Sequence, residues 1–181
     1  MDGKHLLLVT TFFFLGTFAG FFAAEGSLPQ YGLHGSVQPV FSPGAEIAMV
    51  RALASAERSI DIELFQFTYS GLREALVLAV ERGVHVRLIL DPKIDRNWAT
   101  AEFLKSKGVR VRWSSQAFYY THSKYAVMDQ KKVMVGSTNW SYNAMKRNRE
   151  AAVIIEQAEL AEAFERMYEA DWNDAAEVET P

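Results

Sequence analysis

Two side chains that can do acid, base or nucleophilic chemistry stand close together in the second half of the chain. His122 and Lys124 are two residues apart at the start of a predicted strand, Ser123 to Met128. Because side chains alternate along a strand, His122 and Lys124 point to the same face, whereas Asp129 has the opposite parity. We therefore expect His122 and Lys124 to act on one substrate and Asp129 to lie apart from it.

A second polar segment follows the next predicted strand. Gly136-Ser137-Thr138-Asn139 comes directly after Lys132 to Val135, and Ser137 and Asn139 share a face if the chain stays extended. An imidazole, a fixed cation and two neutral hydrogen-bonding groups can thus converge on one anionic group. Phosphodiester cleavage needs these residue types: a nucleophile or proton carrier, a cation for the nonbridging oxygens, and donors for developing charge.

The two segments together resemble the signature of the phospholipase D superfamily. Residues 122–129 read His-Ser-Lys-Tyr-Ala-Val-Met-Asp, with the spacing His-x-Lys-x-x-x-x-Asp, and residues 136–140 read Gly-Ser-Thr-Asn-Trp. The resemblance extends from roughly Val37 to Trp172 and is strongest for small members that carry a single motif. Those members are the bacterial Nuc-type endonucleases and the mitochondrial cardiolipin hydrolase/Zucchini group.

The resemblance implies a role for each polar residue. In that family the motif histidine forms a phosphohistidine intermediate, and a second motif histidine protonates the leaving group. A chain with one motif is then expected to form a homodimer that shares one active site, in which His122 fills both roles. By the same resemblance Lys124 and Asn139 bind the phosphoryl oxygens, Ser137 supports them, and Asp129 is structural. Glu150 stands where members of the family have an acid that orients a histidine, on the same or the partner subunit; its alternative is a surface charge at a strand start.

The residue types present favour chemistry without a metal or another cofactor. Cysteine is absent, which excludes disulfides, thiolate zinc sites and a cysteine nucleophile, and leaves no counterpart to any zinc-binding element of the mitochondrial relatives. The sequence also lacks the H-E-x-x-H zinc motif, the G-x-S-x-G serine hydrolase motif and a phosphate-binding G-x-x-x-x-G-K loop. We expect a metal-independent phosphodiesterase.

Three features of the sequence bear on the substrate: the charge balance, a basic cluster and an aromatic run. Residues 27–155 hold 17 basic and 11 acidic residues, which suits a polyanion or an anionic membrane surface, although a solvated surface explains such segregation equally well. Lys146 and Arg147, in a basic cluster, are the candidates for substrate binding. Phe118-Tyr119-Tyr120 can stack on unpaired bases, enter a lipid interface or pack in the core. The leading prediction is a nonspecific endonuclease on DNA or RNA; the alternative is a phospholipase D that hydrolyses phosphatidyl lipids such as phosphatidylcholine or cardiolipin.

Periodicity predicts the elements that position these residues. Helices are expected at residues 45–56, 72–82, 98–107 and 158–172, and strands at 37–41, 60–67, 84–91, 109–113, 123–128, 132–135 and 151–155. A hairpin is expected at Asp129-Gln130-Lys131. Alternating strands and helices imply the α/β class, here a phospholipase D-like α/β/α sandwich with a mixed sheet and helices on both faces.

The N-terminal region is apolar. Leu6 to Ala24 carries no charge and is long enough to span a bilayer, so residues 1–26 are expected to be a signal peptide, cleaved before Ser27, or a membrane anchor. The protein is accordingly expected to be exported or membrane-anchored. Residues 27–44 read as a linker with a short first strand, 45–173 as the catalytic domain, and 174–181 as an acidic tail.

Overall fold

The structure, a computed structural model, describes residues 31–32 and 34–178. The chain divides into two units, residues 1–32 and 33–181, and every described helix and strand belongs to the second unit. The apolar segment Leu6 to Ala24, predicted to be a signal peptide or membrane anchor, and the predicted cleavage position before Ser27 lie outside the described residues. Within the described part of the chain, no helix has the length and apolar character needed to cross a membrane.

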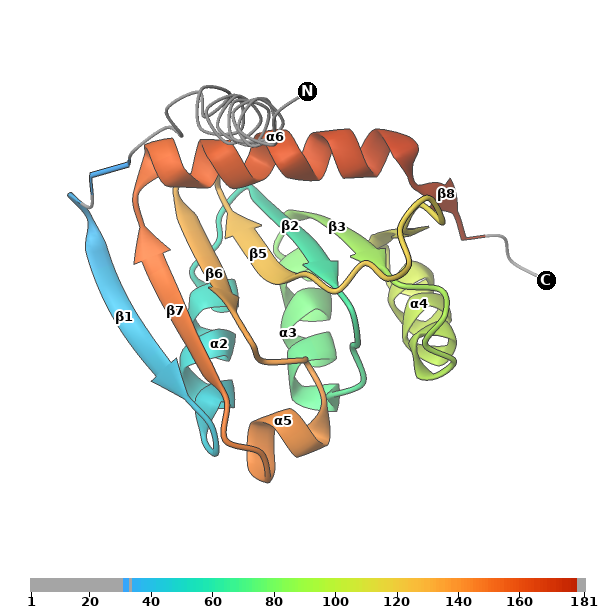
Figure 1. Ribbon diagram of the computed structural model, residues 1–181, viewed down its shortest axis with the longest axis horizontal. Helices are drawn as coiled ribbons and strands as arrows, with labels where there is room; N and C mark the ends of the chain where they lie inside the picture. The colour runs from blue at the N-terminus through green and yellow to red at the C-terminus, as the bar shows by residue number, and fades with distance from the viewer. Residues whose placement is uncertain (1–30, 33, 179–181) are drawn as a thin grey trace, which may run out of the picture. The chain divides into compact units, whose positions relative to one another are not determined.

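An eight-stranded mixed sheet forms the centre of the second unit (Figure 1). The strands are β1 (Ser36–Phe41), β2 (Ser59–Leu64), β3 (His85–Leu90), β4 (Arg110–Trp113), β5 (Lys124–Met128), β6 (Lys132–Gly136), β7 (Ala151–Glu156) and β8 (Ala176–Glu177), in the spatial order β1-β7-β6-β5-β2-β3-β4-β8. The pairs β2·β3 and β3·β4 are parallel, and all other neighbours are antiparallel. The strand that begins at Lys124 therefore lies in the middle of the sheet, between β6 and β2.

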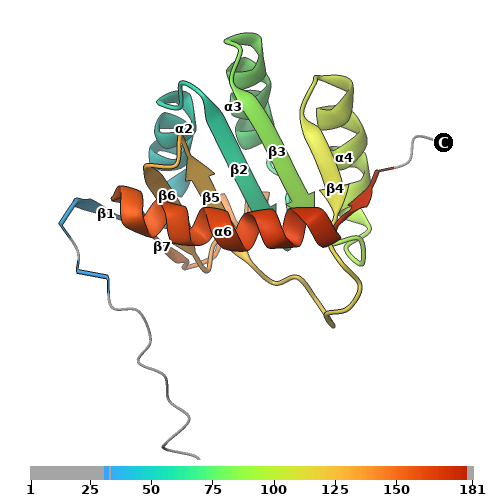
Figure 2. The same ribbon diagram turned by 90° about the horizontal axis from the view of Figure 1, so that it is seen from above.

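Helices cover both faces of the sheet. Figure 2 shows α6 (Ala158–Asp174) running across one face, while α2 (Ala45–Ala54), α3 (Ser70–Glu81) and α4 (Arg96–Ser106) cover the other. Alternation along β2 explains the two layers: Ile60, Ile62 and Leu64 pack in the core with α2, α3 and α4, whereas Asp61 and Glu63 belong to the α6 side. On that second side Tyr125 and Val127 of β5 pack with α6.

The predicted fold class is confirmed, and each predicted long helix and strand is present within a few residues of its expected bounds. The expected hairpin joins β5 to β6, with φ of 56° at both Asp129 and Gln130, as in a type I′ turn. Two elements were not predicted: the five-residue helix α5 (Tyr142–Lys146) and the two-residue strand β8, which lies in the segment expected to be a tail. β1 pairs with β7 from Ser36 to Phe41 and so belongs to the sheet.

Candidate active site

The segment that enters β5 carries His122. Backbone pairing between β5 and β2 continues past the strand end, where the Phe65 N–H donates to the Ser123 carbonyl at 2.9 Å. The His122 side chain is exposed and its ring lies against Phe65, with ring centroids 4.5 Å apart. Phe65 also contacts Tyr120 edge-to-face at 5.5 Å. The imidazole is thus placed by aromatic packing while the rest of it faces solvent.

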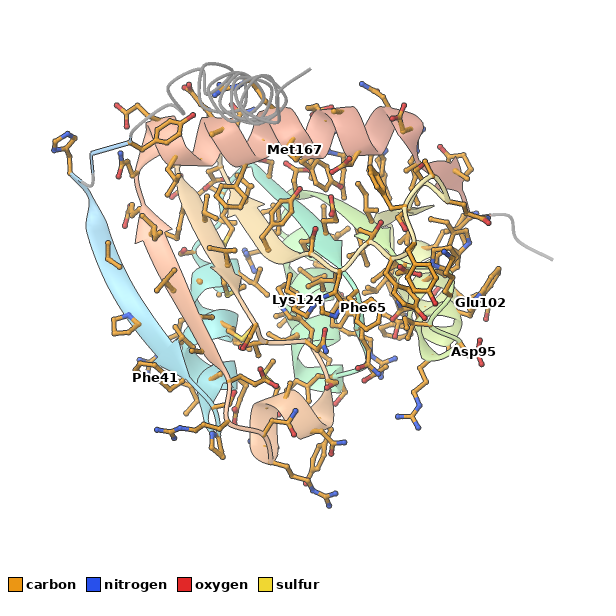
Figure 3. All side chains as sticks on the ribbon, viewed as in Figure 1. Phe41, Phe65, Asp95, Glu102, Lys124 and Met167 are labelled. Carbon is orange, nitrogen blue, oxygen red and sulfur yellow. The ribbon has the colours of Figure 1, made fainter. Side chains whose placement is uncertain are left out.

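Lys124 lies beside this imidazole and is almost buried. It is 9% exposed, and its Nζ lies 3.2 Å from Nδ1 of His122 and donates to the His122 carbonyl at 2.6 Å. The ammonium also lies over the ring of Phe65, 5.2 Å from the centroid, and Figure 3 shows the two side chains together in the middle of the domain. Burial lowers the pKa of Lys124, and the nearby Glu150 carboxylate opposes this. The structure therefore brings together an imidazole and a cation, as the spacing predicted.

Ser137 and Glu150 form the next part of the site. The Ser137 hydroxyl donates to Oε2 of Glu150 at 2.6 Å, and Nδ2 of Asn148 donates to Oε1 at 2.9 Å. Both oxygens of this acid therefore have donors within the same subunit. Gly136 precedes Ser137 at a point of close approach, because a Cβ there would lie 2.4 Å from the Ala151 carbonyl oxygen. The glycine lets β6 lie tightly against β7 and so sets Ser137 next to Glu150.

Asn139 follows on the same segment. The turn is fixed to the end of β2 because the Trp140 N–H donates to Gln66 O at 3.0 Å, and the Thr68 and Tyr69 N–H groups both donate to Trp140 O. Oδ1 of Asn139 is buried and has no hydrogen-bond partner among the described residues. Its amide is a group with unused hydrogen-bonding capacity, two residues from Ser137.

Asp129 lies at the opposite end of β5 from His122. Five residues along a strand separate it from Lys124, a distance of about 16 Å. Its carboxylate accepts three backbone hydrogen bonds, from the N–H groups of Glu57, Arg58 and Ser59 at 3.0, 2.7 and 2.9 Å. Burial alone would raise the pKa of Asp129, but these donors outweigh it and the net shift is downward. Through these hydrogen bonds Asp129 connects the β5–β6 turn to the segment that leads into β2, and it makes no contact with His122 or Lys124.

The basic residues proposed for substrate binding lie on and after α5. Lys146 forms an ion pair with Glu46, which raises the pKa of Lys146. The guanidinium of Arg147 is exposed and lies over the ring of Tyr142, 5.4 Å from its centroid. A phosphate at this surface would find Arg147 accessible, whereas Lys146 would have to leave Glu46.

Several side chains that lie near His122 belong to no sequence motif, so the sequence did not predict that they would lie there. Glu63 of β2 and Asp171 of α6 line a cavity of about 400 Å³ that reaches His122, and Phe118 and Tyr120 form part of its wall. These residues come from three segments far apart in the sequence. The signal that could have pointed to Glu63 is a pair of acidic residues, Asp61 and Glu63, that alternate with apolar residues in a strand at the centre of the sheet. Within the described part of the chain, no three His, Asp or Glu side chains gather in a way that could hold a metal ion.

Comparison with known proteins places this geometry in a family. Residues 49–172 match the family described as "Cardiolipin synthase, PLD-like domain". The mitochondrial cardiolipin hydrolase of Mus musculus is 35% identical over 127 residues, covering 70% of this chain and 57% of that protein. The phospholipase D of Rickettsia typhi is 31% identical over 141 residues, covering 76% and 68%.

Solved structures agree with these sequence relatives. The chain is similar to Nuc from Salmonella typhimurium, described as a phospholipase D family member, with a TM-score of 0.77, 30% identity, and coverage of 81% of this chain and 100% of Nuc. The chain spans about half the length of the mammalian cardiolipin hydrolases that it matches. The motif, the fold and these similarities together lead to one conclusion: the chain belongs to the phospholipase D superfamily.

Proposed function

We propose that this protein is a metal-independent phosphodiesterase that cleaves nucleic acid through a phosphohistidine intermediate. The observation that carries the proposal is the pair formed by exposed His122 and almost buried Lys124, with Nζ 3.2 Å from Nδ1. A phosphate bound at Lys124 would have its phosphorus next to the imidazole. Family relatives that are named as a hydrolase and as phospholipases support the same class of reaction.

The reaction consists of two displacements at phosphorus. Nε2 of one His122 attacks, the new P–N bond forms, and the P–O bond to the leaving group breaks. The leaving oxygen takes a proton from a second, protonated histidine. Water then attacks the phosphorus, gives its proton to that second histidine, and the P–N bond breaks to free the first. Lys124 neutralises the nonbridging oxygens, and the Asn139 amide donates to them.

The hydrogen bonds around His122 support a paired active unit. Nucleophilic attack by Nε2 requires the imidazole proton on Nδ1, and that N–H requires an acceptor. Within one subunit Nδ1 contacts the Lys124 ammonium, which has no lone pair to offer, and the side-chain donors bound to Glu150 are those of Ser137 and Asn148, not of His122. A carboxylate oxygen has lone pairs for more than one donor, so a Glu150 with these two bonds can still accept another. A homodimer supplies what is missing, namely a second His122 and a second Glu150 as the acceptor.

Nucleic acid is the proposed substrate because exposed aromatic and cationic side chains lie near His122. Tyr119 is 82% exposed, Phe118 and Tyr120 are exposed beside it, and Lys93 lies 5.4 Å from the Tyr119 centroid. Stacking platforms with nearby cations are typical of proteins that bind single strands. A phospholipid is the second candidate. It is favoured by the similarity to a cardiolipin hydrolase and to a phospholipase D, and by the exposed tyrosines, which are suited to a lipid interface.

A parallel assay tests the proposal. The purified protein is incubated in excess EDTA with single-stranded DNA, with RNA, and with vesicles of phosphatidylcholine or cardiolipin. We expect cleavage of a nucleic acid, loss of nearly all turnover in His122→Asn, and little change in His85→Asn, which alters an exposed histidine at the start of β3. Inactivation by EDTA that one added metal reverses would contradict the mechanism, and hydrolysis of vesicles alone would move the substrate to the second candidate.

A further inference from the structure

A cavity of about 400 Å³ opens beside His122, on the face of the sheet where Met167 and Asp171 of α6 line it. Its wall includes Phe118 and Tyr120, which are 57% and 43% exposed, and Met167 of α6, and its polar part contains Glu63 and Asp171. The volume exceeds that of a nucleobase, and the two exposed aromatic rings in the wall offer flat apolar surface. The cavity can therefore take a planar group attached to a phosphate at His122.

The charges of this cavity do not suit the phosphate itself. None of the described side chains that line it is Lys or Arg, whereas two are carboxylic acids. Glu63 is 2% exposed and accepts a hydrogen bond from the Tyr125 hydroxyl at 3.1 Å. Burial raises the pKa of Glu63 to about 7, and the neighbouring Asp171 carboxylate contributes to the rise. Near neutral pH Glu63 consequently carries a proton for part of the time, which lessens the attraction of the cavity for a full cation such as an ammonium headgroup.

The loop that forms the wall is held in place. The Lys93 ammonium donates to the carbonyls of Phe118 and Tyr119 at 3.3 and 2.5 Å, and the Thr121 N–H donates to Oδ2 of Asp91 at 2.8 Å. Asp91 is itself 1% exposed, so the anchor of this loop lies in the domain core. The aromatic side chains are thus presented in front of His122 on a braced backbone, which reduces the cost of ordering them when a ligand binds.

We infer that this cavity binds an unpaired guanine next to the scissile phosphate, stacked on Phe118 and Tyr120 with its Watson–Crick edge toward Glu63 and Asp171. Guanine presents two adjacent N–H donors on that edge, and an ionised carboxylate accepts two such donors side by side. Its O6 acceptor is matched by the hydroxyls of Ser114, Ser115 and Ser123, which also line the cavity. The inference rests on the proposed function, because it names the base that a nucleic-acid substrate places beside His122.

The experiment uses the full chain and single-stranded oligonucleotides that differ at one position in a run of uridines. That position holds guanine, inosine, which lacks the exocyclic amine, or an abasic sugar. We expect cleavage next to guanine to have a kcat/KM about tenfold higher than next to inosine, with the abasic site lower still. Glu63→Gln should remove most of the difference between guanine and inosine, and Asp171→Asn should reduce it. Glu74→Gln, at an exposed position of α3, should leave it unchanged.

The outcomes separate this inference from the proposed function. Equal cleavage next to guanine, inosine and the abasic sugar would overturn the guanine site while leaving the nuclease in place. A guanine preference that survives in both Glu63→Gln and Asp171→Asn would overturn the assignment to this cavity. Hydrolysis of phosphatidylethanolamine vesicles without cleavage of any oligonucleotide would overturn the proposed substrate and the guanine site together. If Glu63→Gln does not fold, Asp171→Asn at the half-buried position on α6 carries the test.

Discussion

Lys124 is a cation kept in a place where burial disfavours its charge. It is 9% exposed, burial lowers its pKa, and its nearest polar groups belong to His122. Such a residue stabilises a bound anion more than it stabilises the fold. We therefore expect Lys124→Met to lower kcat on single-stranded DNA by about 100-fold or more, while the free energy of unfolding stays the same or rises by about 1 kcal/mol.

Urea unfolding and steady-state kinetics on the same preparation test this prediction for Lys124. Lys131→Met, at an exposed position in the β5–β6 turn, is the matched control and should leave both quantities nearly unchanged. A Lys124→Met protein with wild-type kcat would show that the phosphate binds elsewhere.

Asp129 behaves in the opposite way, since its contacts serve the fold. Asp129→Ala leaves three backbone N–H groups without their acceptor, and we expect the free energy of unfolding to fall by about 2 kcal/mol with kcat of the folded protein preserved. Because its pKa is lowered in the folded state, this stabilisation is complete above the ordinary value near 3.8 and is lost as the pH falls through the lowered pKa.

Unfolding curves at pH 7 and pH 3 measure the effect of Asp129. The difference between wild type and Asp129→Ala should shrink at the lower pH, and Glu102→Ala, on the exposed face of α4, should show no such dependence. A large drop in kcat at unchanged stability would instead place Asp129 in the chemistry.

At the scale of elements, Arg87 of β3 links this strand to its neighbour β2 and to the helix α6. Its guanidinium donates to Asp61 of β2 at 2.5 Å and to Glu165 and Glu169 of α6 at 3.1 and 2.6 Å. The same group lies 5.0 and 5.3 Å from the ring centroids of Tyr168 and Trp172. Burial raises the pKa values of Asp61 and Glu165, the latter to about 7. One arginine therefore holds α6 against two central strands.

Removing that arginine should destabilise the domain in a pH-dependent way. We expect Arg87→Leu to lower the free energy of unfolding by about 3 kcal/mol at pH 8, because Asp61 and Glu165 remain buried without their cation. The two acids have raised pKa values, so they take up protons as the pH falls, and the loss should be smaller at pH 5. Chemical unfolding at both pH values measures this loss. Arg166→Leu, at an exposed position on α6, is the control and should change the free energy of unfolding little at either pH. An equal loss at both pH values in Arg87→Leu would contradict this role of Arg87.

At the level of elements, the sequence predicted what depends on local periodicity. The long helices α2, α3 and α6 and the central strands have clear apolar patterns, and Asp129-Gln130-Lys131 marked the hairpin. The pattern of α4 is weak, because its buried face includes the polar residues Asn97 and Thr100. The helix α5 has five residues and β8 has two, too few for a pattern to emerge, and β8 forms only because it pairs with Arg112 and Trp113 of β4. The spacing of His122 and Lys124 predicted their contact, whereas the meeting of Glu63, Phe118 and Asp171 depends on how distant segments pack and has no local signal.

The whole active molecule is proposed to be a pair of chains. One subunit offers one histidine in the site, yet attack and leaving-group protonation at the same phosphorus require two. A closed twofold dimer would bring each His122 to the axis. If wild-type and His122→Asn chains are mixed and allowed to exchange, activity should follow the square of the wild-type fraction. A linear dependence, with exchange verified by native mass spectrometry, would mean that each subunit works alone.

The stereochemical course at phosphorus tests the phosphohistidine mechanism most directly. A single-diastereomer phosphorothioate diester is cleaved in ¹⁸O-labelled water, and the configuration of the product is determined. Attack by His122 followed by attack by water inverts the phosphorus twice, so net retention of configuration is expected. Net inversion would mean that water attacks the diester directly, and would contradict a phosphohistidine at His122.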